Sequence, residues 1–164
     1  MLIDFHTHCF PEKIAGKTIE KLSFVSGGLI PQTDGTKDSL LYLMSKDGID
    51  KSVALSIATN ANQQKNVNDF AISLKSEKLI PFGSVFPFSD DWEEELERLK
   101  ENGIKGIKLH PDYQQFFVDD ERLFPVYKKI EKLGFILVFH AGEDFGFAPP
   151  YKATPDRLRK VVTS

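Results

Sequence analysis

The sequence predicts an α/β fold built around a parallel β-sheet. Short apolar runs alternate with longer stretches of helical periodicity, which is the pattern that βαβ units produce. Several of these runs are nearly continuous, as expected for parallel strands buried on both faces. The chain has 164 residues, of which 41% are hydrophobic and 27% charged, so it can bury a sizeable core. We expect a single domain over residues 1–164.

Strands are expected at five places. The clearest is the last, where five apolar residues follow one another without interruption. Each connection is long enough for a helix, so we expect neighbouring parallel strands in the order of the sequence, in a layered or partly rolled sheet. The predicted ranges are Leu2–His6, Ser52–Ile57, Ile80–Phe86, Gly106–Leu109 and Phe135–Phe139.

Helices are expected in the connections. The first connection is unusually long and should hold two helices, Lys17–Phe24 and Ser39–Lys46, separated by turn-rich sequence. Apolar residues recur at spacings of three and four around positions 67–74, 92–99 and 123–130, which predicts one helix in each region.

Residues typical of helix ends support these assignments. Asp90 with Glu93 is a candidate capping box, and Gly103 and Gly134 stand where helices should end. Thr154 should cap a last helix that begins at the following proline.

Composition narrows the class of protein. The net charge of -3 is spread along the chain and forms no basic stripe, so nucleic acid is not expected as a partner. No apolar run approaches the ~20 residues needed to cross a bilayer, and no secretion signal is recognisable at the N-terminus. A cytoplasmic location is therefore expected. The single cysteine, Cys9, is interpreted as a packing residue rather than a nucleophile.

The most informative motif is the histidine pair that ends the first strand. Side chains alternate along a strand, so Asp4, His6 and His8 should point to the same side. Two imidazoles at this spacing can reach one divalent ion, and Asp4 could orient one of them. The alternative is a pair of solvated loop histidines.

His140 ends the fifth strand. Parallel strands end at one edge of a sheet, so His140 should lie near the His6 and His8 pair. Three histidines from two strands then converge on a candidate metal site, although a histidine at the end of a strand can also be merely hydrogen-bonded.

Two more residues at this edge come from the fourth strand. Lys108 and His110 alternate onto one face; Lys108 could hold an anionic substrate group or support the metal site, or extend into solvent from an edge. Glu143 and Asp144, in the loop after His140, could touch substrate or simply cap a turn.

Together, the segments Ile3–His8, Gly106–Pro111 and Val138–Gly142 resemble the amidohydrolase superfamily. The most similar branch is the amidohydrolase-related group that includes aminocarboxymuconate-semialdehyde decarboxylase. The resemblance implies a TIM-barrel-like (β/α)₈ fold with a divalent metal, most commonly zinc, at the C-terminal ends of the strands. It assigns His6, His8 and His140 as metal ligands and leaves Asp4, Lys108, His110 and Glu143 for substrate contacts or for support of the ligands.

The chain departs from this family in length. Such barrels typically run to ~250 residues, whereas the recognisable units here are the first five. We therefore expect an incomplete barrel and a C-terminally truncated chain, in which the catalytic aspartate that the family carries on strand 8 has no counterpart. Uncovered strand edges should then favour self-association.

The resemblance implies a metal-dependent hydrolase that acts on a C–N or C–O bond of a small carbonyl substrate through water activated by the metal. Metal-assisted decarboxylation at the same site is the alternative within the family. A noncatalytic metal-binding or assembly module is the alternative from a different class. In each case the 164-residue chain is expected to be inactive or weakly active on its own.

Overall fold

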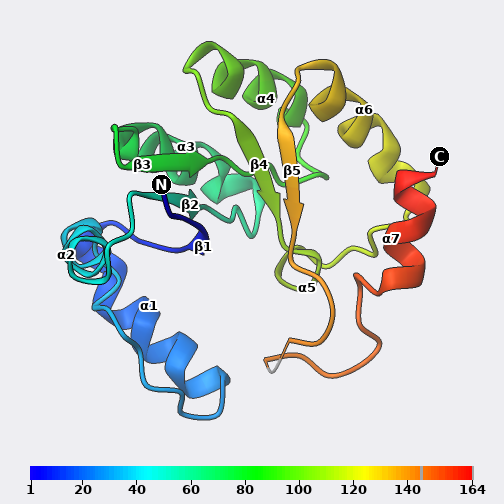
Figure 1. The fold of residues 1–164 in the computed structure, drawn as a ribbon. Coiled ribbons are helices and arrows are strands. Elements are labelled where there is room, and N and C mark those ends of the chain that lie inside the picture. Colours follow the sequence, from blue (N-terminus) through cyan, green and yellow to red (C-terminus); the bar gives the residue numbers. More distant parts are fainter. Residues whose placement is uncertain (145, 164) are drawn as a thin grey trace.

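A computed structural model describes residues 1–144 and 146–163, in which strands and helices alternate along the chain (Figure 1). The strands are β1 (Ile3–Thr7), β2 (Lys51–Leu55), β3 (Leu79–Phe82), β4 (Gly106–Leu109) and β5 (Ile136–Phe139). The α-helices are α1 (Glu12–Val25), α2 (Lys37–Asp47), α3 (Ala61–Leu74), α4 (Trp92–Glu101), α5 (Pro111–Gln114), α6 (Phe124–Lys132) and α7 (Pro155–Val162). A 3-10 turn, η1 (Glu121–Leu123), precedes α6.

The strands are parallel neighbours in sequence order, as predicted. β1, β2 and β3 form one ladder, and β4 and β5 form a second. The two ladders are joined at Gly83, which bridges to Ile107. The N–H of Gly83 donates to the Gly106 carbonyl at 3.0 Å, and its carbonyl accepts from the N–H of Lys108 at 2.8 Å. The result is one curved parallel sheet of an incomplete (β/α) barrel.

The register of the strands assigns their side chains to two faces. The inner face carries Val53 and Leu55 of β2 and Phe82 of β3, which pack together, and in register with them Gly106 and Lys108 of β4. Gly106 is required here, because a Cβ at this position would lie 2.2 Å from the ring of Phe82. A larger residue would push Phe82 out of the centre of the inner face.

The outer face packs against the helices and forms most of the core. Ile107 and Leu109 of β4 are fully buried against Leu96 and Leu99 of α4, in a cluster that also includes side chains of α6 and α7. A second cluster lies between α2 and β2 and contains Cys9. Cys9 is buried, and burial raises the pKa of its thiol to about 11, which confirms its role in packing.

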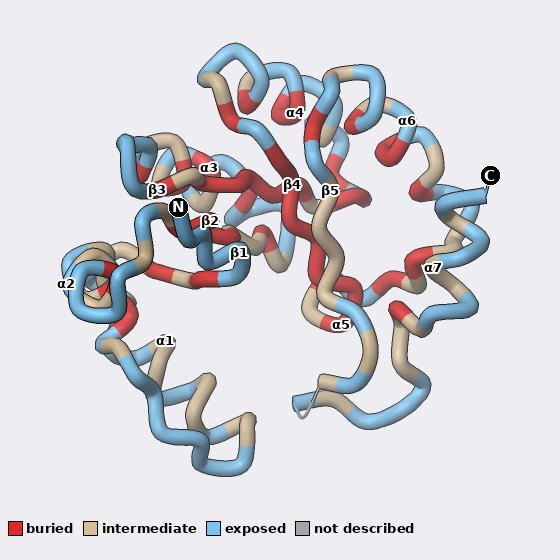
Figure 2. The backbone as a smooth tube through the Cα atoms, viewed as in Figure 1, coloured by how far each residue is buried: buried red, intermediate tan, exposed pale blue. Residues whose placement is uncertain are grey.

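The inner face is buried in the middle of the sheet and open at both edges. Leu55 and Phe82 are at most 3% exposed, whereas Ile3 and Phe5 of β1 and Ile136 of β5 are 39–51% exposed. Figure 2 shows this gradient, with red segments in β3 and β4 and pale blue in β1. The two edge strands thus present apolar side chains with no covering layer among the described residues.

The third strand ends earlier than predicted. The sequence suggested a strand to Phe86, but β3 stops at Phe82. The reason is that side chains of α3 bind the backbone that follows: Ser84 N–H donates to Asn68 Oδ1 at 2.9 Å, and Phe86 N–H donates to Gln64 Oε1 at 2.7 Å. These donors are therefore not free to continue the ladder.

Helix ends agree with the sequence at the glycines and differ at two N-termini. Gly103 and Gly134 have φ of 74° and 70° and directly follow the C-cap residues of α4 and α6, as predicted. The capping box predicted at Asp90 is wrong. Asp91 is the N-cap of α4 and makes no side-chain cap, because its Oδ1 accepts from Gln64 Nε2 at 3.0 Å. The helix predicted from residue 17 begins at residue 12, immediately after Pro11.

Candidate metal centre

A β-bulge in β1 positions the histidine pair. Asp4 pairs with Ser52 and Thr7 with Ala54, so β1 contains one more residue than β2 between these positions. The bulge interrupts the alternation expected from the sequence. The Oδ1 of Asp4 accepts from the backbone N–H of His6 at 3.1 Å.

His8 has the tautomer that metal binding requires. Its Nδ1 lies 2.9 Å from the Leu55 carbonyl oxygen, which can only accept, so Nδ1 carries the proton and Nε2 keeps its lone pair. The carbonyl at the end of β2 thus orients this ring, a role that sequence analysis gave to Asp4.

The separation of the two rings fits a shared ion. His6 Nε2 and His8 Nε2 are 3.2 Å apart. Two ligands in tetrahedral positions ~2.0 Å from one zinc ion would be about 3.3 Å apart. His6 and His8 therefore provide two adjacent positions for a metal ion, which is the arrangement that the His-x-His motif predicts.

His140 lies at the end of β5 next to this pair. A charge on His140 lowers the pKa values of both His6 and His8, so the ring of His140 lies within electrostatic range of the pair. The Nε2 atom of His140 is buried and has no hydrogen-bond partner among the described residues. A buried ring nitrogen without a partner is available to a ligand.

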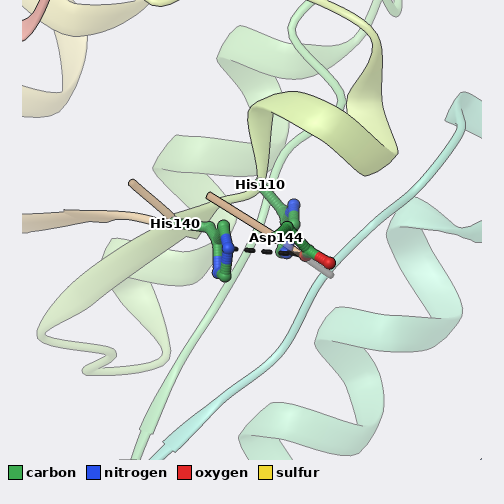
Figure 3. A group of neighbouring side chains, drawn as sticks. All are labelled: His110, His140 and Asp144. Carbon is green, nitrogen blue, oxygen red and sulfur yellow. Dashed lines mark ion pairs between the residues drawn. The ribbon is translucent and has the colours of Figure 1, made fainter. Parts of the chain in front are cut away.

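A second group of potential ligands also contains His140. One nitrogen each from His110 and His140 and a carboxylate oxygen of Asp144 all lie within 4.8 Å of one another (Figure 3). Asp144 Oδ2 is 3.4 Å from His140 Nε2 and 3.5 Å from His110 Nε2.

Ring orientation argues against a metal ion shared by His110 and His140. The two rings are stacked, with centroids 4.1 Å apart and an angle of 11° between their planes. A ring nitrogen binds a metal along its lone pair, in the plane of the ring. Nearly parallel planes at this separation do not meet at one ion. Among the described residues, His110, His140 and Asp144 are the group whose ligand atoms all lie close together, whereas the ligand atoms of His6, His8 and His140 do not all lie within 4.8 Å of one another.

The tautomer of His110 also argues against a metal ion shared by His110 and His140. Its Nδ1 accepts from the backbone N–H of Tyr113 at 3.4 Å, where it caps α5, so the proton of the neutral ring is on Nε2 and faces Asp144. His110 thus presents Nε2–H, rather than a lone pair for a metal ion, on the side of Asp144, whose Oδ2 lies 3.5 Å away.

The site keeps its imidazoles neutral. Burial is the main cause, and it lowers the pKa of His8 to about 4 and that of His110 to about 3. The pKa values of His6 and His140 are also lowered, again chiefly by burial. Only neutral imidazole binds a metal ion, so the folded chain presents these rings in the binding-competent form at neutral pH.

Lys108 lies within the same cluster. It is fully buried on the inner face of β4, and its Nζ has no hydrogen-bond partner in the part of the chain that is described. Burial lowers its pKa to about 8. The sequence placed Lys108 and His110 on one face; the register covers Lys108 and ends at Leu109, one residue before His110.

The two acidic residues predicted at the site, in the loop after β5, have different surroundings. Glu143 is exposed, and its Oε1 accepts from the Tyr151 hydroxyl at 2.7 Å. Asp144 instead contacts both stacked rings. The sequence suggested both residues as substrate contacts; the structure brings only Asp144 to the histidines.

Gln114 is a supporting residue that sequence analysis missed. Its Oε1 accepts from the backbone N–H of His110 at 2.8 Å, while its Nε2 donates to the carbonyls of Ala58 and Val85 at 2.8 Å each. One buried amide thereby ties the ends of three strands together next to the site. A glutamine four residues after His110, on a short helix, was the only signal available in the sequence.

Fold and site together define a class: a parallel α/β barrel segment with a histidine cluster at the C-terminal ends of its strands, the edge where barrel enzymes place their active sites. Comparison with protein families makes this specific. Residues 3–161 match the Amidohydrolase family, and the chain belongs to this family of metal-dependent enzymes. A comparison with curated proteins finds no match.

Solved structures with the same fold include three that are 16% identical to this chain. IDCase from Metarhizium anisopliae, in its apo form, has a TM-score of 0.62 and 16% identity, with 85% of this chain and 50% of that chain covered. A structure described as an amidohydrolase from Staphylococcus aureus has a TM-score of 0.62 and 16% identity, with 86% of this chain and 47% of that chain covered. The third is a 5-carboxyvanillate decarboxylase from Novosphingobium aromaticivorans with manganese and 3-methoxy-4-hydroxy-5-nitrobenzoic acid bound. Its TM-score is 0.61 and its identity 16%, with 87% of this chain and 51% of that chain covered.

The chain thus spans about half the length of the solved structures that it matches. At this level of identity the similarity establishes the fold. Across residues 1–144 and 146–163, no helix is both long enough and apolar enough to cross a membrane.

Proposed function

We propose that this chain forms the metal-binding part of a hydrolase that cleaves a C–N or C–O bond of a small carbonyl substrate. The observation that carries the proposal is the His6 and His8 pair, with ring nitrogens 3.2 Å apart and the His8 tautomer fixed by the Leu55 carbonyl. His140, whose buried Nε2 has no hydrogen-bond partner among the described residues and lies 3.4 Å from Asp144 Oδ2, is proposed as the third ligand.

A divalent ion at these nitrogens would supply Lewis-acid polarisation of the substrate carbonyl and of water. The chain's own residues have separate tasks. Asp144, beside His140 Nε2, is the acidic group that can accept a proton at its Oδ2. His110 directs its Nε2–H toward the same carboxylate and holds it at the site.

Zinc is the metal that we propose. Three neutral imidazoles suit zinc, which is commonly held by nitrogen ligands in catalytic sites. Manganese is the alternative to test, since it is the metal bound in the 5-carboxyvanillate decarboxylase structure.

Decarboxylation is the second candidate, and a specific observation favours it. Two of the structures with this fold are 5-carboxyvanillate decarboxylases, from Novosphingobium aromaticivorans and Sphingomonas paucimobilis. Release of carbon dioxide from an aromatic acid, measured beside hydrolysis of amides and esters, distinguishes the two reactions.

Metal titration of the purified chain tests the site. We expect one zinc ion per chain, with affinity reduced at least ~10-fold in His8→Ala and in His140→Ala. His110→Asn is the matched control, since it removes a histidine from the stacked pair and leaves the proposed ligands in place. If His110→Asn abolished binding while His8→Ala did not, the metal would belong to the group of His110, His140 and Asp144.

Activity assays then separate an enzyme from a binding module. Turnover that disappears with a chelator and returns with zinc supports the hydrolase or the decarboxylase, according to the product. Stoichiometric zinc binding without any turnover supports the noncatalytic metal-binding module.

A further inference from the structure

Lys108 is a buried cation with no partner for its charge. Its side chain is fully buried, and no described residue accepts a hydrogen bond from Nζ. A buried charge normally needs an ion pair or several hydrogen bonds, because desolvation is expensive. In this chain an apolar residue could fill the same space without that cost.

The groups around Lys108 are bases rather than acids. Its charge lowers the pKa values of His6 and His8 from β1, of His140 from β5 and of His110 at the end of its own strand, which places the amine among all four rings. Desolvation alone shifts the pKa of Lys108, and no carboxylate counteracts it. The carboxylate of Asp144 lies against His110 and His140 and does not offset the desolvation of Lys108.

We propose that Lys108 is the binding position for a carboxylate group of the substrate, so that the substrate of this site is a small organic anion. The ammonium group has three donors and no acceptor, and its hydrogen bonds are strongest to an ionised oxygen. A neutral carbonyl could accept one of these hydrogen bonds but would leave the charge uncompensated.

This inference rests on the proposed function, and it narrows the substrate class for both candidate reactions. A hydrolase would act on an amide or ester that also bears a carboxylate, and a decarboxylase would act on the carboxylate itself. Of the rings around the amine, His6 is exposed and the His140 side chain is 26% exposed, so these two lie between Lys108 and solvent.

Binding of benzoate to the metal-free chain, measured by calorimetry in the presence of a chelator, tests the inference. Benzamide, of the same shape without the charge, is the matched ligand. We expect benzoate to bind at least ten times more tightly than benzamide in the wild type, and this preference to disappear in Lys108→Met, which keeps the length of the side chain. A wild type that binds both ligands equally or binds neither would overturn the inference, as would an unchanged preference in Lys108→Met.

A measurement on the wild type alone guards against a misfolded variant. Benzoate affinity should be constant from pH 6.5 to 7 and fall about tenfold per pH unit well above pH 8, as the Lys108 ammonium loses its proton. Affinity that stays constant to pH 10 would refute the role of Lys108. Because these titrations contain no metal, failure of the zinc site would leave their outcome unaffected, and failure of benzoate binding would leave the zinc titration intact.

Discussion

Replacing His110 by asparagine should flatten the pH dependence of stability of the metal-free chain. Burial lowers the pKa of His110 to about 3 in the folded state, from an ordinary value of 6.5. The unfolded chain therefore binds a proton at His110 that the folded chain does not. The contribution of His110 to the unfolding free energy is fully present above pH 6.5 and is lost as the pH falls toward 3.

The magnitude follows from the two pKa values. Between pH 7.5 and pH 5, His110 alone should remove about 2 kcal/mol of unfolding free energy, since each pH unit below 6.5 costs about 1.4 kcal/mol. Asparagine is a good helix N-cap, so it preserves an acceptor for the N–H of Tyr113 at the start of α5. Between pH 7.5 and pH 5, the unfolding free energy of His110→Asn should therefore fall by about 2 kcal/mol less than that of the wild type.

Urea unfolding at pH 7.5 and pH 5.0, followed by fluorescence of the single tryptophan, Trp92, measures this difference. Trp92 packs against the core cluster that contains β4, so it reports on the part of the fold that holds His110. His6→Asn is the control, because His6 is exposed and should change the pH dependence less. Equal pH dependence in the wild type and His110→Asn would refute the reasoning.

Two other predictions concern packing and assembly. Gly106→Ala should lower the unfolding free energy by about 1–3 kcal/mol, because the new Cβ would lie 2.2 Å from the Phe82 ring. The control is Gly16→Ala in α1, where a new Cβ would have nothing within 4 Å. This variant should be neutral or stabilising in the same urea titration. We also propose that the chain self-associates through its two sheet edges. Sedimentation should show association that increases with concentration and weakens in Phe5→Lys and Ile136→Lys; a monomer at all concentrations would contradict it.

The sequence was sufficient for the order of the elements and for the residues that meet at the strand ends. Apolar runs such as Phe135–Phe139 can be recognised locally, and all parallel strands end at one edge, so His6, His8 and His140 could be predicted to lie near one another before the structure was known. Alternation along β4 also predicted that Lys108 and His110 share a face, and the register places Lys108 in line with Val138 of β5.

Features that depend on contacts between elements could not be predicted in this way. The stacking of His110 on His140 depends on how β4 and β5 are aligned, and the approach of Asp144 depends on the path of the loop after β5. The hydrogen bonds of Gln64 and Asn68 to the backbone after β3 join residues about 16–22 positions apart, and nothing in the local pattern marks them.

These departures from local pattern lie near one edge of the sheet. The bulge in β1 falls between Asp4 and Thr7, beside His6; β3 ends early at Phe82; and His110 leaves the ladder to cap α5. Bulges and side-chain caps redirect polar groups at the places where regular pairing would otherwise hide them. Departures from simple sequence rules are expected where function constrains the chain. Their coincidence with the histidine cluster is therefore an independent structural reason to place the active site at this edge.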